Sequence, residues 1–284
     1  MQQTYATHTQ AQPRDHNNIE LVSNAAFRSK VMGKTFSVDI YLPLNYRANP
    51  DKKYKVLYAN DGQDMPAVRL RETLDSLQSN HLMEPVIVVA VHADSTRRMI
   101  YGTANQSNYR GFGALAGKYT LFILQELMPY VEHNFNVLRG PENTAFMGFS
   151  LGGLSAFDIV WNHPGVFSQS GVFSGSFWWR SKGYDDGYTD LDRIMHAEIR
   201  NGKHKPGLGF WLQTGTKDET SDRDKDGIID SIGDTMDIIR ELKKKDYSDR
   251  DIRYLEIVDG EHNQKTWAIA MPDFLTWAYG TNSK

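Results

Sequence analysis

The chain has 284 residues, a formal net charge of −3 and no cysteine. The lack of cysteine excludes a disulfide framework, a thiol nucleophile and a cysteine-ligated metal site. The charge shows no basic stripe, which argues against nucleic-acid binding, and no run of about 18 apolar residues predicts a membrane helix.

The first 18 residues are polar and lack the apolar centre of a signal peptide. We expect a disordered tail here, in a protein that is either cytosolic or a mature form from which a signal was removed. From residue 19 to 284, strand-like runs alternate with helical patterns, and no Pro/Ser-rich linker divides them. This pattern predicts a single α/β domain whose mostly parallel sheet is covered by helices on both faces.

The predicted elements follow in chain order. Two strands, at 19–28 and 35–42, are expected to form the antiparallel start of the sheet. The remaining strands are expected at 55–59, 86–91, 145–147, 167–173, 209–214 and 252–258. Helices are expected at 65–79, 118–132, 152–162, 190–200, 232–244 and 266–279.

The most informative motif is G-x-S-x-G, which spans residues 148–152 and has Ser150 at its centre. An apolar strand-like run precedes it and a helical pattern follows. A strand, a sharp turn carrying serine and then a helix form the nucleophile elbow of an α/β-hydrolase. Glycines flank the serine because larger side chains would clash in so tight a turn. The motif therefore predicts Ser150 as a nucleophile.

A serine nucleophile needs a base, and the base needs an orienting acid. In this fold the acid and then the histidine follow the serine in chain order, each after a strand. Asp218 follows the strand at 209–214, and His262 follows the last strand and a glycine turn. We therefore predict Asp218 as the acid and His262 as the base. Three nearby acids remain alternatives for the acid, namely Glu219, Asp222 and Asp224.

The oxyanion of an acyl-transfer reaction needs two backbone N–H donors. One is expected from Leu151, directly after the nucleophile, and the other from the loop after the third strand. That loop spans residues 60–64, where Gly62 permits close approach of substrate and Gln63 is the predicted donor.

Four segments of the chain resemble one known family. They are Ile40-Tyr41-Leu42-Pro43, Val56-Leu57-Tyr58-Ala59-Asn60-Asp61-Gly62, Met147-Gly148-Phe149-Ser150-Leu151-Gly152-Gly153 and Gly260-Glu261-His262. The chain is similar there to the esterase family that includes esterase D, enterochelin esterase and the feruloyl and acetylxylan esterases. The resemblance spans about residues 30–280 and implies a Ser-Asp-His esterase. Many relatives carry His-Gly where this chain has Asp-Gly, which leaves the substrate preference open.

Two segments are candidates for substrate binding. The loop after the sixth strand contains Trp178, whose exposed face would suit a sugar ring or an aromatic acyl group. The insert at 95–118 carries Arg97 and Arg98, either of which would pair with a substrate carboxylate or phosphate. His92, directly after a buried strand, is expected to line the site.

An acidic loop gives a second chemical signal. Acids occupy positions 1, 3, 5 and 9 of an EF-hand-like pattern, with glycine at position 6. The predicted ligands of a structural Ca²⁺ are Asp222, Asp224, Asp226, Ile228 and Asp230. Position 12 holds Gly233 where a glutamate is expected, and Asp234 is a possible substitute. The alternative is a solvated acidic turn.

These observations predict a serine carboxylic-ester hydrolase that needs no organic cofactor. Its expected substrates are small-molecule or saccharide esters, with feruloyl or acetyl sugar esters suggested by the family resemblance. Two alternatives remain open from the sequence. One is acyl transfer or peptide hydrolysis on the same triad, and the other is a non-catalytic carbohydrate-binding relative. The sequence does not decide the oligomeric state.

Overall fold

The computed structural model describes residues 18–281. Apart from Asn18, the predicted tail at residues 1–18 lies outside this range. Among the described helices, none combines the length and the apolar character needed to cross a membrane.

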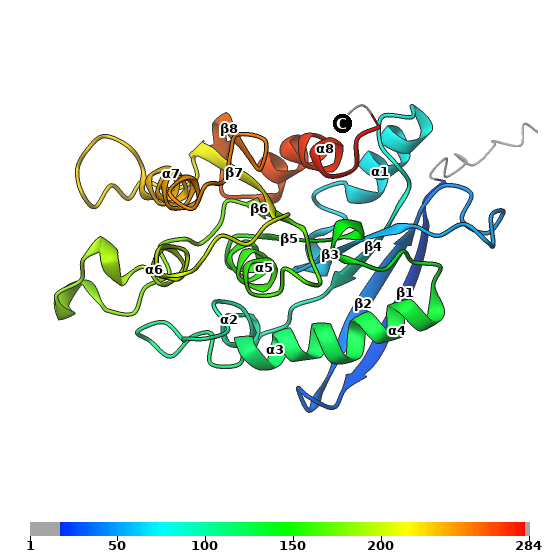
Figure 1. Cartoon of the computed structure of the whole chain (residues 1–284), viewed down its shortest axis with the longest axis horizontal. Coiled ribbons are helices and arrows are strands. Elements are labelled where there is room, and N and C mark those ends of the chain that lie inside the picture. The colour runs from blue at the N-terminus through cyan, green and yellow to red at the C-terminus, as the bar shows by residue number, and fades with distance from the viewer. Residues whose placement is uncertain (1–17, 282–284) are drawn as a thin grey trace, which may run out of the picture.

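The described chain forms one eight-stranded sheet in the order β1-β2-β4-β3-β5-β6-β7-β8 (Figure 1). The strands are β1 (Glu20–Ser29), β2 (Lys34–Leu42), β3 (Lys55–Ala59), β4 (Val86–Val91), β5 (Thr144–Phe149), β6 (Gln169–Phe173), β7 (Gly209–Lys217) and β8 (Ile252–Glu261). Strand β2 pairs antiparallel with β1 and β4, whereas every other neighbouring pair is parallel. The mostly parallel sheet and its antiparallel start confirm the predicted fold class.

Burial of the central strands explains why they read as continuous apolar runs. All six residues of β4 and all six of β5 are buried, because helices cover the sheet on both faces. The edge strands β1 and β8 are mostly exposed or half-buried. Among their described residues, the buried ones are Phe27 and Ser29 in β1 and Ile252 and Gly260 in β8.

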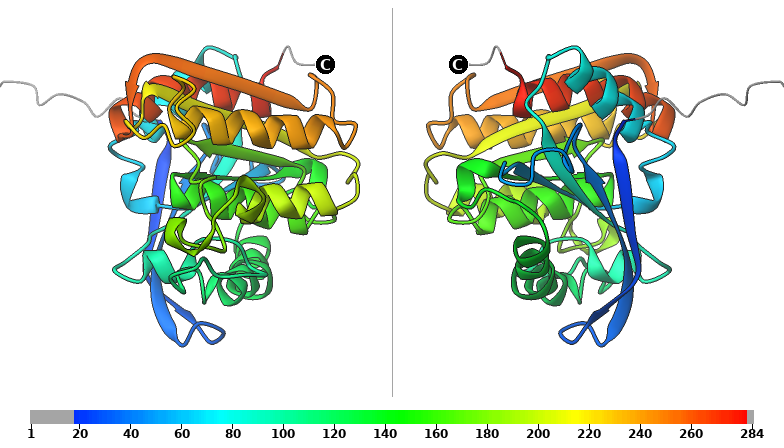
Figure 2. Two further views of the ribbon diagram at one scale, coloured as in Figure 1. Left: turned by 90° about the vertical axis from the view of Figure 1, so that its left-hand side faces the viewer. Right: turned by 90° about the vertical axis from the view of Figure 1, so that its right-hand side faces the viewer.

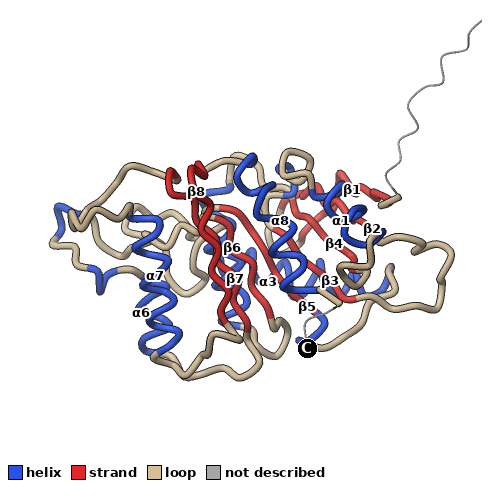
Figure 3. Tube along the Cα trace, turned by 90° about the horizontal axis from the view of Figure 1, so that it is seen from above, coloured by secondary structure: helices blue, strands red, loops and turns tan. Residues whose placement is uncertain are grey.

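The helices divide into two layers. They are α1 (Leu70–Ser79), α2 (Arg97–Ile100), α3 (Ala116–Phe122), α4 (Met128–Asn134), α5 (Leu151–Asn162), α6 (Ile194–Asn201), α7 (Asp230–Lys243) and α8 (Gln264–Tyr279). Helices α1 and α8 pack on one face and share one apolar cluster with the sheet. Helices α3, α5, α6 and α7 contribute to a second cluster on the opposite face. Figures 2 and 3 show the sheet between these layers.

The structure corrects the predicted helices at three points. Helix α1 begins at Leu70 rather than at residue 65, because a short turn (Gly62–Asp64) and a left-handed Arg69 come first. The helix expected at 118–132 contains a π-helical turn (Ile123–Leu127) just before Pro129. Proline has no N–H to continue the α-helical hydrogen bonds. In the helix expected at 190–200, a separate turn (Asp190–Asp192) precedes α6.

The topology brings several loops to one edge of the sheet. Strands β3, β5, β6, β7 and β8 lie side by side and parallel, so their carboxyl ends meet at the same edge. The predicted oxyanion loop, nucleophile, acid and base each follow one of these strands. In open α/β sheets, this edge is where ligands bind.

Candidate active site

Ser150 stands at a strained turn between β5 and α5. Its backbone has φ 55° and ψ −120°, which is uncommon for a residue with a side chain. A Cβ added to Gly148 would collide with the carbonyl of Gly152, and one added to Gly152 would collide with Asp61. Close approach of backbone therefore requires the glycine at 148, and the buried Asp61 side chain leaves no room for a side chain at 152.

Asp218 and His262 face each other from neighbouring strands. Asp218 follows β7 and His262 follows β8, and His262 Nδ1 lies 3.9 Å from Asp218 Oδ1. The Asp218 side chain is fully buried, whereas that of His262 is 39% exposed. The separation is longer than a hydrogen bond by about 1 Å, and such contacts are often long in the absence of substrate.

The Asp218 carboxylate is held by Ser174, which Trp267 holds in turn, and neither residue was predicted as part of the site. Ser174 Oγ donates to Asp218 Oδ1 at 3.0 Å and accepts from Trp267 Nε1 at 3.0 Å. The Trp267 ring also meets His262 edge-on, with 5.4 Å between centroids. Ser174 directly follows β6, which was a usable signal, but Trp267 resembles an ordinary core residue of a helix.

Burial disfavours the charged forms of both Asp218 and His262, and this shifts their pKa values in opposite directions. It raises the pKa of Asp218, although hydrogen bonds from Ser174 and the backbone oppose the shift. It lowers the pKa of His262, which the negative charge of Asp218 partly offsets and the positive charge of Arg97 reinforces. A histidine with a lowered pKa is neutral at pH 7 and able to accept a proton.

The Ser150 hydroxyl contacts another serine. Its Oγ lies 3.3 Å from Ser176 Oγ, and either oxygen could be the donor. Among the described residues, no hydrogen bond joins Ser150 to His262. The three predicted residues thus lie at one edge of the sheet without being closed into a hydrogen-bonded chain.

The two predicted oxyanion donors lie at the starts of helical turns. Leu151 is the first residue of α5, and Gln63 lies in the short turn Gly62–Asp64. N–H groups in a first helical turn have no acceptor within their own helix. The partial positive charge at the α5 N-terminus also favours an anion beside Ser150.

Arg97 and His92 are engaged by the protein itself. Arg97 forms a two-pronged ion pair with buried Asp61, at 2.7 and 2.8 Å. His92 Nε2 lies 2.8 Å from Asp39, and its ring packs against Gly62. The predicted pairing of Arg97 with a substrate carboxylate is therefore replaced by an internal partner. Arg98, the alternative, lies over the ring of Phe112.

Of the three consecutive aromatic residues at 177–179, in the loop after β6, only Trp178 is exposed. Trp178 has 37% of its surface exposed, whereas Phe177 and Trp179 are each 1% exposed. The ring of Trp179 fills the space beside Gly102 and Gly113, so it anchors the insert that follows β4. Trp178 is thus the member of this loop that is free to meet a ligand.

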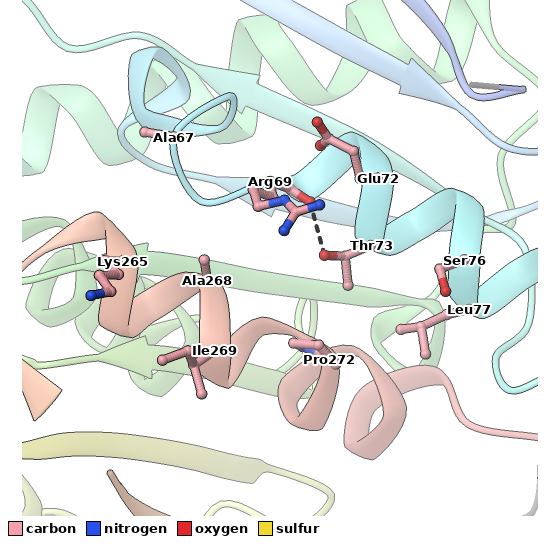
Figure 4. A pocket seen from close by; sticks show the side chains of 10 residues that line it. All are labelled: Ala67, Arg69, Glu72, Thr73, Ser76, Leu77, Lys265, Ala268, Ile269 and Pro272. Carbon is pink, nitrogen blue, oxygen red and sulfur yellow. Dashed lines mark hydrogen bonds between the residues drawn. The ribbon is translucent and has the colours of Figure 1, made fainter. Parts of the chain in front are cut away.

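A groove of about 660 Å³ lies between α1 and α8 (Figure 4). The α1/α8 groove is lined by Ala67, Arg69, Glu72, Thr73, Ser76, Leu77, Lys265, Ala268, Ile269 and Pro272. None of the predicted site residues is among them.

The side chain of Gln264 donates to Asp64 at 3.1 Å, which joins the start of α8 to the oxyanion loop.

The acidic loop brings only part of the predicted calcium ligand set together. Carboxylate oxygens of Asp222, Asp224 and Asp226 lie within 4.8 Å of one another. Asp230 instead accepts a hydrogen bond from the backbone of Arg223 at 3.0 Å. Asp234, the possible substitute at position 13, is paired with Arg193 and Arg223 and is not available. The Ca²⁺ interpretation remains a prediction that rests on three carboxylates.

If the acidic loop binds Ca²⁺, the melting temperature is expected to be higher in millimolar Ca²⁺ than in EDTA. An ion that binds only the folded state adds about 2.7 kcal/mol of stability at 100 times its Kd. Scanning calorimetry of the wild type and Asp226→Asn checks this, because the variant should lose the difference. Equal melting temperatures for the wild type in both buffers would leave only a solvated acidic turn.

Comparison with known proteins agrees with this architecture. Residues 29–278 match the family model described as "Putative esterase". The protein YbbA of Bacillus subtilis (strain 168), described as uncharacterized, is 23% identical over 248 residues, which cover 86% of this chain and 92% of YbbA.

Two solved structures show the same fold. A ferulic acid esterase has a TM-score of 0.71 at 16% identity, covering 93% of this chain and 98% of that chain. The enterobactin esterase FES from Shigella flexneri, in the presence of enterobactin, has a TM-score of 0.70 at 19% identity, covering 92% of this chain and 58% of that chain. The fold is that of an α/β-hydrolase. Because the family model matches most of its length, the chain belongs to this esterase family and is a carboxylic ester hydrolase.

Proposed function

We propose that the chain hydrolyses esters through a catalytic triad of Ser150, His262 and Asp218. The observation that carries the proposal is the position of Asp218 and His262. They follow the adjacent parallel strands β7 and β8, at the same sheet edge as the strained Ser150. His262 Nδ1 lies 3.9 Å from Asp218 Oδ1. Among the acids of the described chain, Asp218 is the one that pairs with His262, so it is favoured over Glu219, Asp222 and Asp224.

In the first half of the reaction, Ser150 Oγ attacks the ester carbonyl while His262 Nε2 accepts the hydroxyl proton. For this step the Ser150 hydroxyl donates to His262 in place of its contact with the Ser176 hydroxyl. Backbone N–H groups of Leu151 and Gln63 stabilise the oxyanion. The imidazolium then gives its proton to the leaving alcohol, which leaves an acyl group on Ser150.

In the second half, His262 takes a proton from water, and the resulting nucleophile attacks the acyl-enzyme. Collapse of the second tetrahedral intermediate releases the carboxylic acid, and Ser150 recovers its proton from His262. Asp218 keeps the imidazole in the tautomer that presents Nε2 to the serine. Its charge also stabilises the imidazolium formed in both halves.

For the substrate, we propose an acylated sugar or another ester with a feruloyl or acetyl group. The exposed Trp178 offers an aromatic face on the loop that begins at Ser174, beside Asp218. Aromatic faces of this kind suit sugar rings and aromatic acids. The name of the ferulic acid esterase with the same fold agrees with this choice.

A fluorophosphonate probe tests the nucleophile directly. Attack by Ser150 Oγ on phosphorus displaces fluoride, so the folded protein should gain the mass of one phosphonyl group, located on Ser150 by peptide mass spectrometry. Protein unfolded in urea should not react, because only the folded site supplies a base. A folded sample that stays unlabelled would count against the triad and favour a binding protein.

A further inference from the structure

The side chain of Arg97 joins the two loops that hold the proposed oxyanion donors. Arg97 begins α2, in the insert that follows β4. Its Nε and Nη2 donate to the two carboxylate oxygens of Asp61, and Nη2 also donates to the carbonyl of Phe149 at 3.1 Å. Asp61 lies two residues before Gln63, and Phe149 lies two residues before Leu151. One guanidinium therefore connects both loops.

Asp61 is held in a single position by several contacts. Its backbone is left-handed, with φ 59°, and its N–H donates to the hydroxyl of Tyr101 at 3.1 Å. Its side chain is fully buried, and the side chain of Gln63 donates to Oδ1 at 3.3 Å. A buried carboxylate is costly unless it is paired, so Arg97 is needed to keep this conformation.

The position of the Asp61 charge matters as well as its geometry. Asp61 Oδ2 lies against Gly152, in the first turn of α5, where a Cβ would collide with it. An uncompensated anion at that point would oppose the negative charge that develops on the substrate oxygen beside Leu151. The guanidinium of Arg97 cancels it.

We infer that Arg97 and Asp61 form a neutral clamp that positions the oxyanion loop against the nucleophile elbow. Arg97 is then a positioning residue rather than a substrate ligand. This inference rests on the proposed function of Ser150 and His262. It assigns a use to the aspartate of the Asp-Gly sequence in the oxyanion loop.

Three variants separate this clamp from a substrate-binding role: Arg97→Met, Asp61→Asn and the double variant. Arg97→Met should lower kcat for a p-nitrophenyl ester about 10²-fold while leaving KM nearly unchanged, because the clamp acts in the transition state. In the double variant no buried charge is left unpaired, so its kcat should be about tenfold higher than that of Arg97→Met. A raised KM with unchanged kcat, or strictly multiplicative losses, would overturn the inference.

The pKa of His262 provides a readout that does not depend on turnover. The charged groups that act on His262 are Asp218 from the end of β7 and Arg97 from α2. Removing the Arg97 charge should raise the pKa of His262, and Asp61→Asn, which leaves Arg97 uncompensated, should lower it. NMR titration measures both shifts, with His262→Gln to assign the signal. Arg97→Lys keeps the charge and should leave the pKa close to that of the wild type.

The two hypotheses fail in different ways. A wild type that neither turns over esters nor reacts with the fluorophosphonate would contradict the proposed function, whatever the titrations show. Opposite pKa shifts in Arg97→Met and Asp61→Asn would still support the clamp in that case. An unchanged His262 pKa in both variants, in protein with wild-type circular dichroism, would refute the clamp.

Discussion

Ser150→Ala should reduce kcat/KM for p-nitrophenyl acetate and butyrate by about 10³-fold or more. The variant keeps the base and the oxyanion donors but lacks the oxygen that attacks the carbonyl, so only water attack assisted by the site remains. Among the described residues, the Ser150 hydroxyl makes one hydrogen bond, to Ser176, so removing the hydroxyl should barely change the melting temperature. Steady-state kinetics and calorimetry on the same samples measure both quantities.

The matched control for this prediction is Ser79→Ala. Ser79 is exposed at the end of α1, so its replacement should leave kcat/KM unchanged. Turnover by Ser150→Ala close to the wild-type rate would show that another group is the nucleophile.

Asp218→Asn should reduce kcat by about 10³- to 10⁴-fold. An asparagine in this place no longer fixes the productive tautomer of His262 and no longer stabilises the imidazolium. The carboxylate of Asp218 also raises the pKa of His262, so its removal lowers that pKa further. Because the neutral base is the active form, the acid limb of the residual kcat/KM profile should move to lower pH.

The neighbouring Glu219→Gln variant is the control for Asp218→Asn. Glu219 is half-buried in the same loop, but within the described chain it forms no ion pair or hydrogen bond with His262. Its replacement should leave the rate and the acid limb nearly unchanged. A large loss in Glu219→Gln together with an active Asp218→Asn would mean that the acid has been wrongly assigned.

Much of the fold follows from local patterns in the sequence. Strands β3 and β4 match the predicted ranges because fully buried parallel strands are short, continuous apolar runs. The predicted start of α1 was wrong because Arg69 adopts a left-handed conformation, which the identity of an arginine does not predict. The π-helical turn precedes Pro129, so the proline was the signal in the sequence for an irregular turn there.

At the site, chain order predicted which residues gather but not how they are paired. Ser150, Asp218 and His262 each follow a strand, and parallel strands end at one edge. The partner of Asp218 is Ser174, which lies 44 residues earlier in the chain and is held in turn by Trp267. The place of Ser174 directly after β6 was a usable signal, but nothing local marks Trp267 as its donor. Arg97 was expected to meet substrate because it lies in the insert at 95–118. Its pairing with Asp61, 36 residues earlier in the chain, is not visible in the sequence.

Because β8 lies at the edge of the sheet, the activity of this enzyme and the stability of its central strands need not be lost together. Strand β8 carries the proposed base, yet it pairs with only one neighbouring strand, whereas β5, which carries the nucleophile, pairs with two. Edge elements open locally at a lower free energy than the centre of a sheet. We therefore expect mild denaturant to abolish ester hydrolysis while the central strands still exchange their amide protons slowly.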